Sequence, residues 1–360
     1  MMRAVIAKDK KLRVDDWPDP VPAEGQVLVK TLACGICGSD LHMLKHADHM
    51  IGLSERAGSR VTAFDSSRDL VYGHEFSAEI LDFGPGTQKN LKVGATVCSM
   101  PVLIGPSGAA GLGYSNDKPG GYGELMVLSE GLLLEVPSGL SADHAALTEP
   151  MAVGAHAVIK GDMGKNDVAL VIGCGPVGLA VIAGLKARGL GPVIAADFSK
   201  KRRTLAEIAG ADTVIDPGEV SPYSRWTEMG VPVTGDEVTL KTMLGETVKS
   251  AVIFECVGVK GVVQEIIDGA PVGSRIVVAG VCMDTDHFEP ALAIVKQLDI
   301  RFVLGYSPEE FSETLRHIAE GTIDVEPFIT GNVSLEGVAQ AFEDLASPDV
   351  HAKILVKPWG

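Results

Sequence analysis

The chain has 360 residues, of which 46% are hydrophobic and 22% are charged, so it is long enough to fold as two domains with a large core. Its 31 basic and 47 acidic residues give a formal net charge of −16, which argues against nucleic acid or an anionic membrane as a partner. The first residues contain no apolar core of signal-peptide length, and the six cysteines form no disulfide framework. A cytoplasmic location is therefore expected.

The first part of the chain alternates short apolar segments with turns rich in Gly and Pro. An opening strand pair is followed by predicted strands over 26–32, 79–83 and 95–99. This pattern favours a mainly β domain that ends near residue 152, such as a distorted barrel.

From residue 153 to residue 290, apolar strands alternate with helices, which predicts a doubly wound parallel sheet. Its elements are expected over 168–172, 193–196, 251–255 and 275–279 for strands and over 262–269 for one helix. No structure is assigned to the polar stretch 221–247.

After residue 290 the pattern predicts three helices and two strands, and the last helix and strand are expected to rejoin the β domain. The α/β domain would then be inserted into the β domain. A cleft between the two domains would hold the active site.

A glycine motif follows the apolar strand at 168–172. Gly173, Gly175 and Gly178 form G-x-G-x-x-G, in which the glycines permit a tight turn, a close approach to a pyrophosphate and close packing of helix on strand. Pro176 suits the first turn of a helix because its missing N–H would have no partner there. The free N–H groups of this turn favour an anion, so the motif predicts a dinucleotide site.

Asp197 ends the next predicted strand, roughly 20 residues after Gly178, where a carboxylate can bind the adenosine ribose and repel a 2′-phosphate. NAD is therefore expected, and the basic run 200–203 leaves NADP as the less favoured alternative. A membrane span over 168–185 is the competing interpretation, since that stretch carries no charge. Its three glycines and one proline argue against a span.

Three separated segments carry metal-binding residue types: Cys34-Gly-Ile-Cys37-Gly-Ser39-Asp40-Leu-His42, Gly73-His74-Glu75 and Thr148-Glu149-Pro150. Cysteine, histidine and carboxylate are the ligands of a catalytic zinc that keeps one position open. Each segment alone has a plainer explanation, because a His-Glu pair is usually only hydrogen-bonded and a C-x-x-C can be a redox pair. Cys34 is expected to be a small buried residue.

Together these segments resemble the zinc-dependent alcohol dehydrogenases of the medium-chain dehydrogenase/reductase family. The resemblance rests on G-I-C-G-S-D-x-H at 35–42, G-H-E at 73–75, G-G-Y-G-E at 120–124 and E-P-M-A-V-G-A-H-A at 149–157. The last segment is similar to the polyol and secondary-alcohol branch, in which an acid replaces a cysteine ligand. The resemblance implies a Rossmann domain inserted into a GroES-like catalytic domain, with limits at 1–152, 153–290 and 291–360.

The resemblance also implies the zinc site. Cys37, His74 and Glu149 would be the ligands, and Glu75 would be a neighbouring carboxylate that can move onto the metal. Asp40 would orient the site.

For catalysis, the resemblance implies that Ser39 passes the alcohol proton toward His42 and solvent. Lys353 is expected to face the pyrophosphate of the cofactor. The implied cofactor-binding residues are Gly173, Gly175, Pro176, Val177, Gly178, Asp197, Arg202, Cys256, Val257, Gly258, Gly280 and Val281.

The expected reaction is hydride transfer between an alcohol or polyol and NAD, giving an aldehyde or ketone, in a homodimer or homotetramer. One catalytic Zn²⁺ is expected per chain. No structural zinc is expected, because residues 98–122 contain only Cys98 and a closed site needs four ligands. The alternatives are a zinc-free quinone or enoyl reductase, which Cys37 and His74 argue against, and a non-catalytic nucleotide-binding relative.

Overall fold

The computed structural model describes residues 1–58, 64–105 and 108–360. The chain divides into two compact units. Unit 1 comprises Met1–Glu149, Phe311–Gly321 and Phe328–Gly360, and unit 2 comprises Pro150–Glu310 and Thr322–Pro327.

Unit 2 is built on a six-stranded parallel sheet with the order β12-β11-β10-β13-β14-β15. Its strands are β10 (Val168–Ile172), β11 (Val193–Ala196), β12 (Thr213–Ile215), β13 (Ala251–Glu255), β14 (Arg275–Val278) and β15 (Asp299–Phe302). The strand order reverses direction between β10 and β13, which is the point where a doubly wound sheet binds its ligand. This arrangement confirms the predicted Rossmann sheet.

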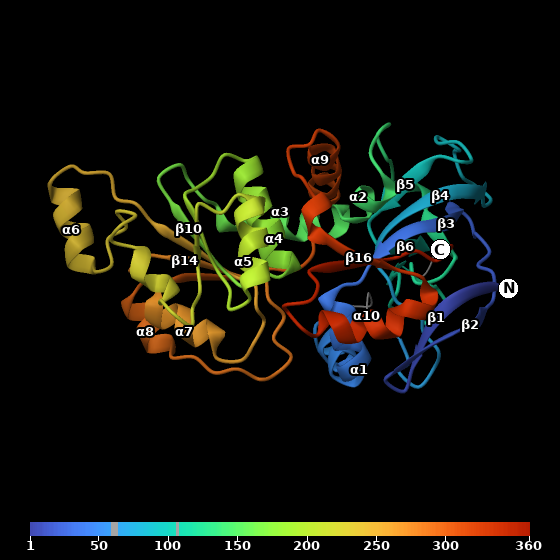
Figure 1. Ribbon diagram of the computed structural model, residues 1–360, viewed down its shortest axis with the longest axis horizontal. Coiled ribbons are helices and arrows are strands. Elements are labelled where there is room, and N and C mark those ends of the chain that lie inside the picture. The colour runs from blue at the N-terminus through green and yellow to red at the C-terminus, as the bar shows by residue number, and fades with distance from the viewer. Residues whose placement is uncertain (59–63, 106–107) are drawn as a thin grey trace. The chain divides into compact units, whose positions relative to one another are not determined.

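Helices cover both faces of this sheet (Figure 1). Helix α4 packs on α5 and α7 packs on α8, and because parallel crossovers are generally right-handed, the two pairs lie on opposite faces of the sheet. The helices of unit 2 are α4 (Pro176–Ala187), α5 (Lys200–Ala209), α6 (Gly235–Met243), α7 (Val262–Gly269) and α8 (Pro290–Val295), together with most of α3 (Thr148–Gly161). The β13 side chains and those of β10 from Val168 to Val171 are buried, as a sheet covered on both faces requires.

The structure differs from the sequence-based boundary at residue 290. Helix α8 and strand β15 lie in unit 2, because β15 pairs with β14 as the sixth parallel strand of the Rossmann sheet. The return to unit 1 begins only at Phe311, inside α9 (Pro308–Ala319).

Unit 1 is mainly β, as predicted. A seven-stranded mixed sheet has the order β16-β17-β3-β4-β5-β9, with β8 also paired to β3, and the hairpins β1–β2 and β6–β7 lie beside it. Its strands are β1 (Met2–Lys8), β2 (Lys11–Trp17), β3 (Gln26–Gly35), β4 (Glu75–Phe83), β5 (Thr96–Ser99), β6 (Val102–Gly105), β7 (Gly108–Gly111), β8 (Leu125–Ser129), β9 (Leu133–Glu135), β16 (Ile329–Val333) and β17 (Lys353–Val356). The helices are α1 (Gly38–Arg56), α2 (Ala142–Ala146) and α10 (Val338–Leu345), together with most of α9.

The polar stretch 221–247, and a segment after His42 for which the sequence predicts no helix or strand, both contain ordered elements. Helix α1 occupies the first part of the segment after Ser39, and only its residues Asp40 and Met43 are buried. In the polar stretch 221–247, Trp226 is buried and its indole N–H donates to the Gly269 carbonyl (3.2 Å). This contact fixes the stretch against unit 2 before α6 begins.

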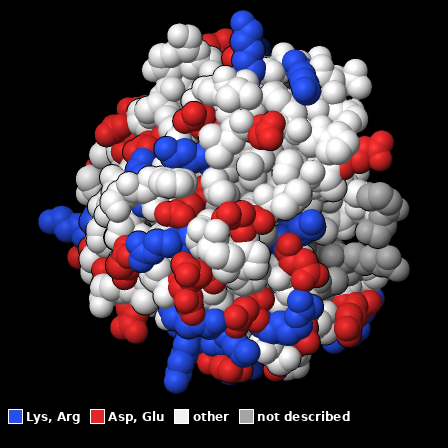
Figure 2. Space-filling model, turned by 90° about the vertical axis from the view of Figure 1, so that its right-hand side faces the viewer, with Lys and Arg blue, Asp and Glu red and all other residues white. Residues whose placement is uncertain are grey.

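Charged side chains of both signs are interspersed on the face shown in Figure 2. Among the described residues, the structure has no helix that combines the length and the apolarity needed to cross a bilayer. The uncharged stretch 168–185 is instead β10 followed by α4.

Candidate active site

Cys37 stands between the end of β3 and the start of α1. Its backbone is extended (φ −93°, ψ 150°) as the N-cap residue of the helix, where the helix dipole favours a negative charge. The carboxylate of Asp40, three residues into the helix, accepts a hydrogen bond from the Cys37 N–H (3.1 Å). The C-G-S-D sequence therefore fixes both the thiol and a buried carboxylate at one helix end.

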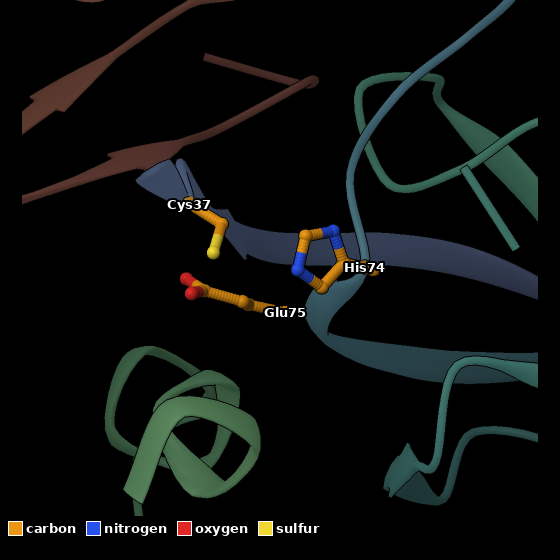
Figure 3. Close-up of side chains that lie close together, drawn as sticks. All are labelled: Cys37, His74 and Glu75. Atoms are coloured by element: carbon orange, nitrogen blue, oxygen red, sulfur yellow. The ribbon is translucent and has the colours of Figure 1, made fainter. Parts of the chain in front are cut away.

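His74 and Glu75 are placed opposite Cys37 by the start of β4. The preceding Gly73 has φ of +104°, and a Cβ there would lie only 2.8 Å from the backbone of Tyr122, so glycine is required. One ligand atom from each of Cys37, His74 and Glu75 lies within 4.8 Å of the other two, and the three side chains point toward one another (Figure 3). Sulfur, imidazole nitrogen and carboxylate oxygen are all zinc ligands, so the donor set fits this metal.

The Nδ1 nitrogen of His74, which does not face Cys37, has a carboxylate partner of its own. Its Nδ1 lies 3.3 Å from Asp40 Oδ1, and the other ring nitrogen faces Cys37 (Figure 3). Such a carboxylate partner fixes the tautomer and orientation of a metal-binding imidazole. Burial disfavours a charge on His74, but the Asp40 and Cys37 charges raise the pKa of the imidazole well above its ordinary value. Burial also opposes ionisation of Asp40, yet His74, Tyr122 and the Cys37 N–H lower the pKa of its carboxyl.

The expectation that Lys353 faces a pyrophosphate is wrong. Its ammonium lies in the interior of unit 1, 2.7 and 2.6 Å from the two oxygens of Glu75, and it also donates to the Ile36 carbonyl (3.0 Å). The side chains of Lys353 and Glu75 are only 3% and 1% exposed. Burial would lower the pKa of Lys353, but the Glu75 and Cys37 charges raise it above its ordinary value. Lys353 is therefore the counter-ion of the carboxylate beside the metal site.

Glu149 lies in the first turn of α3 and is 9% exposed. Its charge also raises the pKa of Lys353, so it lies within electrostatic reach of the Lys353–Glu75 pair. The described group that could hold a metal contains Glu75 and does not include Glu149. The structure thus brings together three of the four expected zinc-site residues.

Ser39 lies in the first turn of α1, and its hydroxyl is 2.9 Å from the hydroxyl of Tyr114. In the described part of the chain Ser39 makes no hydrogen bond to His42, which lies exposed on the same helix. Burial, His46 and Lys45 together lower the pKa of His42.

The glycine motif forms the predicted turn between β10 and α4. Gly173 has φ of +88°, and a Cβ at Gly178 would lie 1.8 Å from the Gly173 carbonyl oxygen, so the helix packs directly on the turn. At Gly175 the nearest side-chain atom to an added Cβ is Nη1 of Arg202, 3.7 Å away. The Nε of Arg202 is buried and has no hydrogen-bond partner among the residues that the structure describes. An open glycine face beside an unpaired guanidinium nitrogen fits a phosphate-bearing cofactor.

Asp197 follows β11 at the edge of this turn. Its carboxylate accepts hydrogen bonds from the N–H groups of Cys174 (2.8 Å) and Ser199 (2.8 Å), and Arg202 Nη1 lies 4.0 Å from it. These contacts fix the carboxylate beside the position where the glycine motif would hold an adenosine ribose.

A second close approach lies after β13 and β14. A Cβ at Gly280 would lie 2.3 Å from the Gly258 nitrogen, and one at Gly258 would lie 2.7 Å from the Val281 backbone. The Glu255 side chain ties this junction together by accepting hydrogen bonds from the N–H groups of Val257 (2.7 Å) and Gly258 (2.8 Å). Cys256 precedes Val257, so all the expected residues of this segment meet at one edge of the sheet.

Sequence reasoning missed two tyrosines of the site. Tyr122 donates to Asp40 (2.7 Å), and Tyr114 lies within hydrogen-bond distance of Ser39, Asp40 and His74. Tyr122 lies in the G-G-Y-G-E segment, which offered a signal, whereas nothing in the sequence around Tyr114 indicates its position.

The comparisons with known proteins agree with this arrangement. The alcohol dehydrogenase GroES-like domain matches residues 23–138, and the zinc-binding dehydrogenase family matches residues 176–320. The (R,R)-butanediol dehydrogenase of Neisseria gonorrhoeae is 31% identical to this chain over 96% of each protein. Sorbitol dehydrogenase of Mus musculus is 26% identical over 96% of this chain and 92% of its own length.

A solved structure of 2R,3R-butanediol dehydrogenase from Bacillus subtilis matches 99% of this chain and 100% of its own, with a TM-score of 0.81 and 27% identity. The chain therefore belongs to the zinc-dependent alcohol and polyol dehydrogenases of the medium-chain dehydrogenase/reductase family, oxidoreductases that exchange a hydride between an alcohol and a nicotinamide cofactor.

Proposed function

We propose that this protein oxidises a hydroxyl group of a diol or polyol with NAD, using one zinc ion per chain. The observation that carries the proposal is the convergence of Cys37, His74 and Glu75 in unit 1, in a chain whose unit 2 carries the dinucleotide turn. Relatives named for butanediol, sorbitol and xylulose support a substrate with more than one hydroxyl group.

Cys37, His74 and Glu149 would hold the metal, with Glu75 as the carboxylate that can exchange onto it. When bound, zinc acts as a Lewis acid that makes an alcohol proton easier to remove. The protein supplies the rest of the chemistry: Asp40 orients His74, and the Ser39 hydroxyl accepts the alcohol proton and passes it on toward His42.

NAD is the proposed cofactor, with NADP less favoured. Support comes from Asp197, whose partly buried carboxylate is held next to the glycine turn, where it would bind ribose hydroxyls and repel a 2′-phosphate. The residues proposed to line the cofactor are those of the glycine motif, Arg202 and the Cys256–Gly258 and Gly280–Val281 segments.

Initial rates measured over a panel of simple alcohols, diols and polyols, each with NAD and NADP, test the proposal. We expect the highest kcat/KM for a diol or polyol with NAD, and loss of turnover after zinc removal. Full activity of the zinc-free protein would identify a zinc-free reductase. Failure to reduce NAD with every alcohol, despite bound zinc and bound NAD, would identify a non-catalytic relative.

The metal site itself is tested by Cys37→Ser, with Cys282→Ser as the matched control outside the site. Elemental analysis should find one zinc per chain in wild type and in Cys282→Ser and close to none in Cys37→Ser. Two zinc ions per chain would contradict the proposed absence of a structural zinc. That absence is proposed because residues 98–122 contain a single cysteine, Cys98, which is buried in β5.

We also propose a homo-oligomer that forms through the open edge of the Rossmann sheet. Strand β15 is the last strand on its side, and apolar side chains gather beside it with exposed fractions of 74% for Ile294, 74% for Val295, 70% for Phe302 and 87% for Leu304. An edge strand with exposed apolar side chains can pair with a second copy. Light scattering should give a multimer for wild type and a smaller mass for Leu304→Glu, whereas Met243→Glu, exposed on α6, should leave the mass unchanged. A monomeric wild type would refute this.

A cytoplasmic location is proposed because all six cysteines are free thiols. Cell fractionation with an antibody against the protein tests it.

A further inference from the structure

Tyr114 reaches the metal site from a segment of unit 1 that has no assigned role. It follows the β6–β7 hairpin, and the adjacent Gly113 (φ +79°) lies so close to Gly73 that a Cβ would be 3.0–3.2 Å from the Gly73 backbone. This backbone contact brings Tyr114 next to His74, the residue after Gly73. The position of Tyr114 is therefore determined by the close backbone contact between Gly113 and Gly73.

The ring of Tyr114 is held between two aromatic neighbours. Its centroid is 5.3 Å from that of His74 at a tilt of 37°, and 6.2 Å from that of Tyr72 in an edge-to-face arrangement. The ring of Tyr114 therefore contacts aromatic side chains, and its hydroxyl is the only polar atom of the side chain available for hydrogen bonds.

Three polar atoms surround that hydroxyl: Ser39 Oγ at 2.9 Å, Asp40 Oδ1 at 3.2 Å and His74 Nδ1 at 3.3 Å. Asp40 accepts from every other group that it meets, including Tyr122 (2.7 Å) and the Cys37 N–H (3.1 Å), as an ionised carboxylate does. The single proton of Tyr114 is therefore donated to Asp40. The phenol oxygen then has only acceptor capacity left for its closest neighbour, Ser39.

We propose that Tyr114 is a positioning residue that fixes the direction of the Ser39 hydroxyl. Ser39 donates its own proton to the Tyr114 oxygen, so the lone pairs of Ser39 Oγ are free to accept the proton of the substrate alcohol. The chain of donors runs from the alcohol through Ser39 and Tyr114 to the Asp40 carboxylate. In this arrangement the proton that Ser39 gives up leaves toward Asp40 rather than directly toward His42, to which Ser39 makes no hydrogen bond among the described residues. This inference rests on the proposed role of Ser39 as the proton acceptor.

Steady-state kinetics of the zinc-loaded protein with its best alcohol and NAD test the assignment through Tyr114→Phe, which removes only the hydroxyl. We expect kcat to fall about tenfold, the value of one well-placed hydrogen bond, with KM for the alcohol nearly unchanged. Zinc content by elemental analysis and NAD affinity by fluorescence titration should match wild type, because Tyr114 binds neither group. A change in KM or zinc content with unchanged kcat would overturn the assignment in favour of a structural role.

A double-mutant cycle separates positioning of Ser39 from general support of Asp40. Tyr114→Phe should have no further effect on kcat in a Ser39→Ala background, because the hydroxyl that it orients is gone. Tyr122→Phe is the matched control: it also removes a hydroxyl from Asp40 but does not contact Ser39, so its effect should be equal in both backgrounds. Equal effects of Tyr114→Phe in both backgrounds would refute the proposal. If Ser39→Ala alone has wild-type kcat, the proposed proton acceptor fails instead.

Discussion

The Lys353–Glu75 ion pair gives the sharpest test of how the metal site is supported. Lys353→Met keeps the length and apolar stem of the side chain but removes the ammonium that binds both Glu75 oxygens and the Ile36 carbonyl. Both partners are buried to 3% exposure or less, so solvent cannot screen the loss. Removal of one partner from a buried pair costs roughly 3–5 kcal/mol, because the other charge stays buried without compensation. We expect a decrease of this size in the free energy of unfolding of the zinc-free protein, measured by urea denaturation.

A second lysine offers the matched control. Lys357, four residues further along the chain, pairs with Asp143, and these side chains are 27% and 33% exposed. A partly exposed pair contributes about 0–1 kcal/mol, so Lys357→Met should be close to neutral. Glu75→Gln added to Lys353→Met should recover much of the lost stability, because it removes the uncompensated charge. Equal destabilisation by the two lysine substitutions would refute the reasoning.

Other outcomes follow from the cofactor turn and the metal ligands. Gly178→Ala should lower the free energy of unfolding by about 1–3 kcal/mol, because its Cβ would meet the Gly173 carbonyl, whereas Gly175→Ala should unfold like wild type and bind NAD more weakly, as calorimetry would show. Asp197→Ser should reduce the preference for NAD over NADP in kcat/KM at least about tenfold, because a carboxylate that repels the 2′-phosphate is lost; an unchanged ratio would place cofactor discrimination elsewhere. In the zinc-free protein the pKa of His74 is raised, so zinc binding should release a proton and weaken as the pH falls, which titration calorimetry in buffers of different ionisation enthalpy would detect.

The Rossmann elements could be predicted because burial on both faces leaves a clear sequence pattern. Strands β10, β11 and β13 and helix α7 begin and end where the apolar runs do. Helix α1 has no comparable signal, since two of its 19 residues are buried and its sequence mixes histidines, lysine and aspartates with apolar residues. The sequence likewise does not indicate that Trp226 is buried, because the stretch around it is polar.

The residues of the site also differ in whether a local sequence pattern predicts them. Cys37 and Asp40 share one helix end, and His74 and Glu75 share one strand end, so short motifs predict each pair correctly as neighbours. Tyr114 joins them through backbone packing of two distant glycines, which leaves no local pattern.

The partner of Lys353 could not be predicted from the sequence alone. It lies in β17, which pairs antiparallel with β3 so that Leu355 is opposite Gly35. This register places the lysine beside Ile36 and Glu75, which are 317 and 278 residues away along the chain. A lysine within the buried run K-I-L-V cannot remain charged there without a partner, so the sequence does indicate that some acid must meet it. Only the strand register decides that this acid is the one next to the metal site rather than a group on the cofactor. The same register makes the electrostatics of the site depend on the last strand of the chain, so a change in β17 should alter metal binding without touching a ligand.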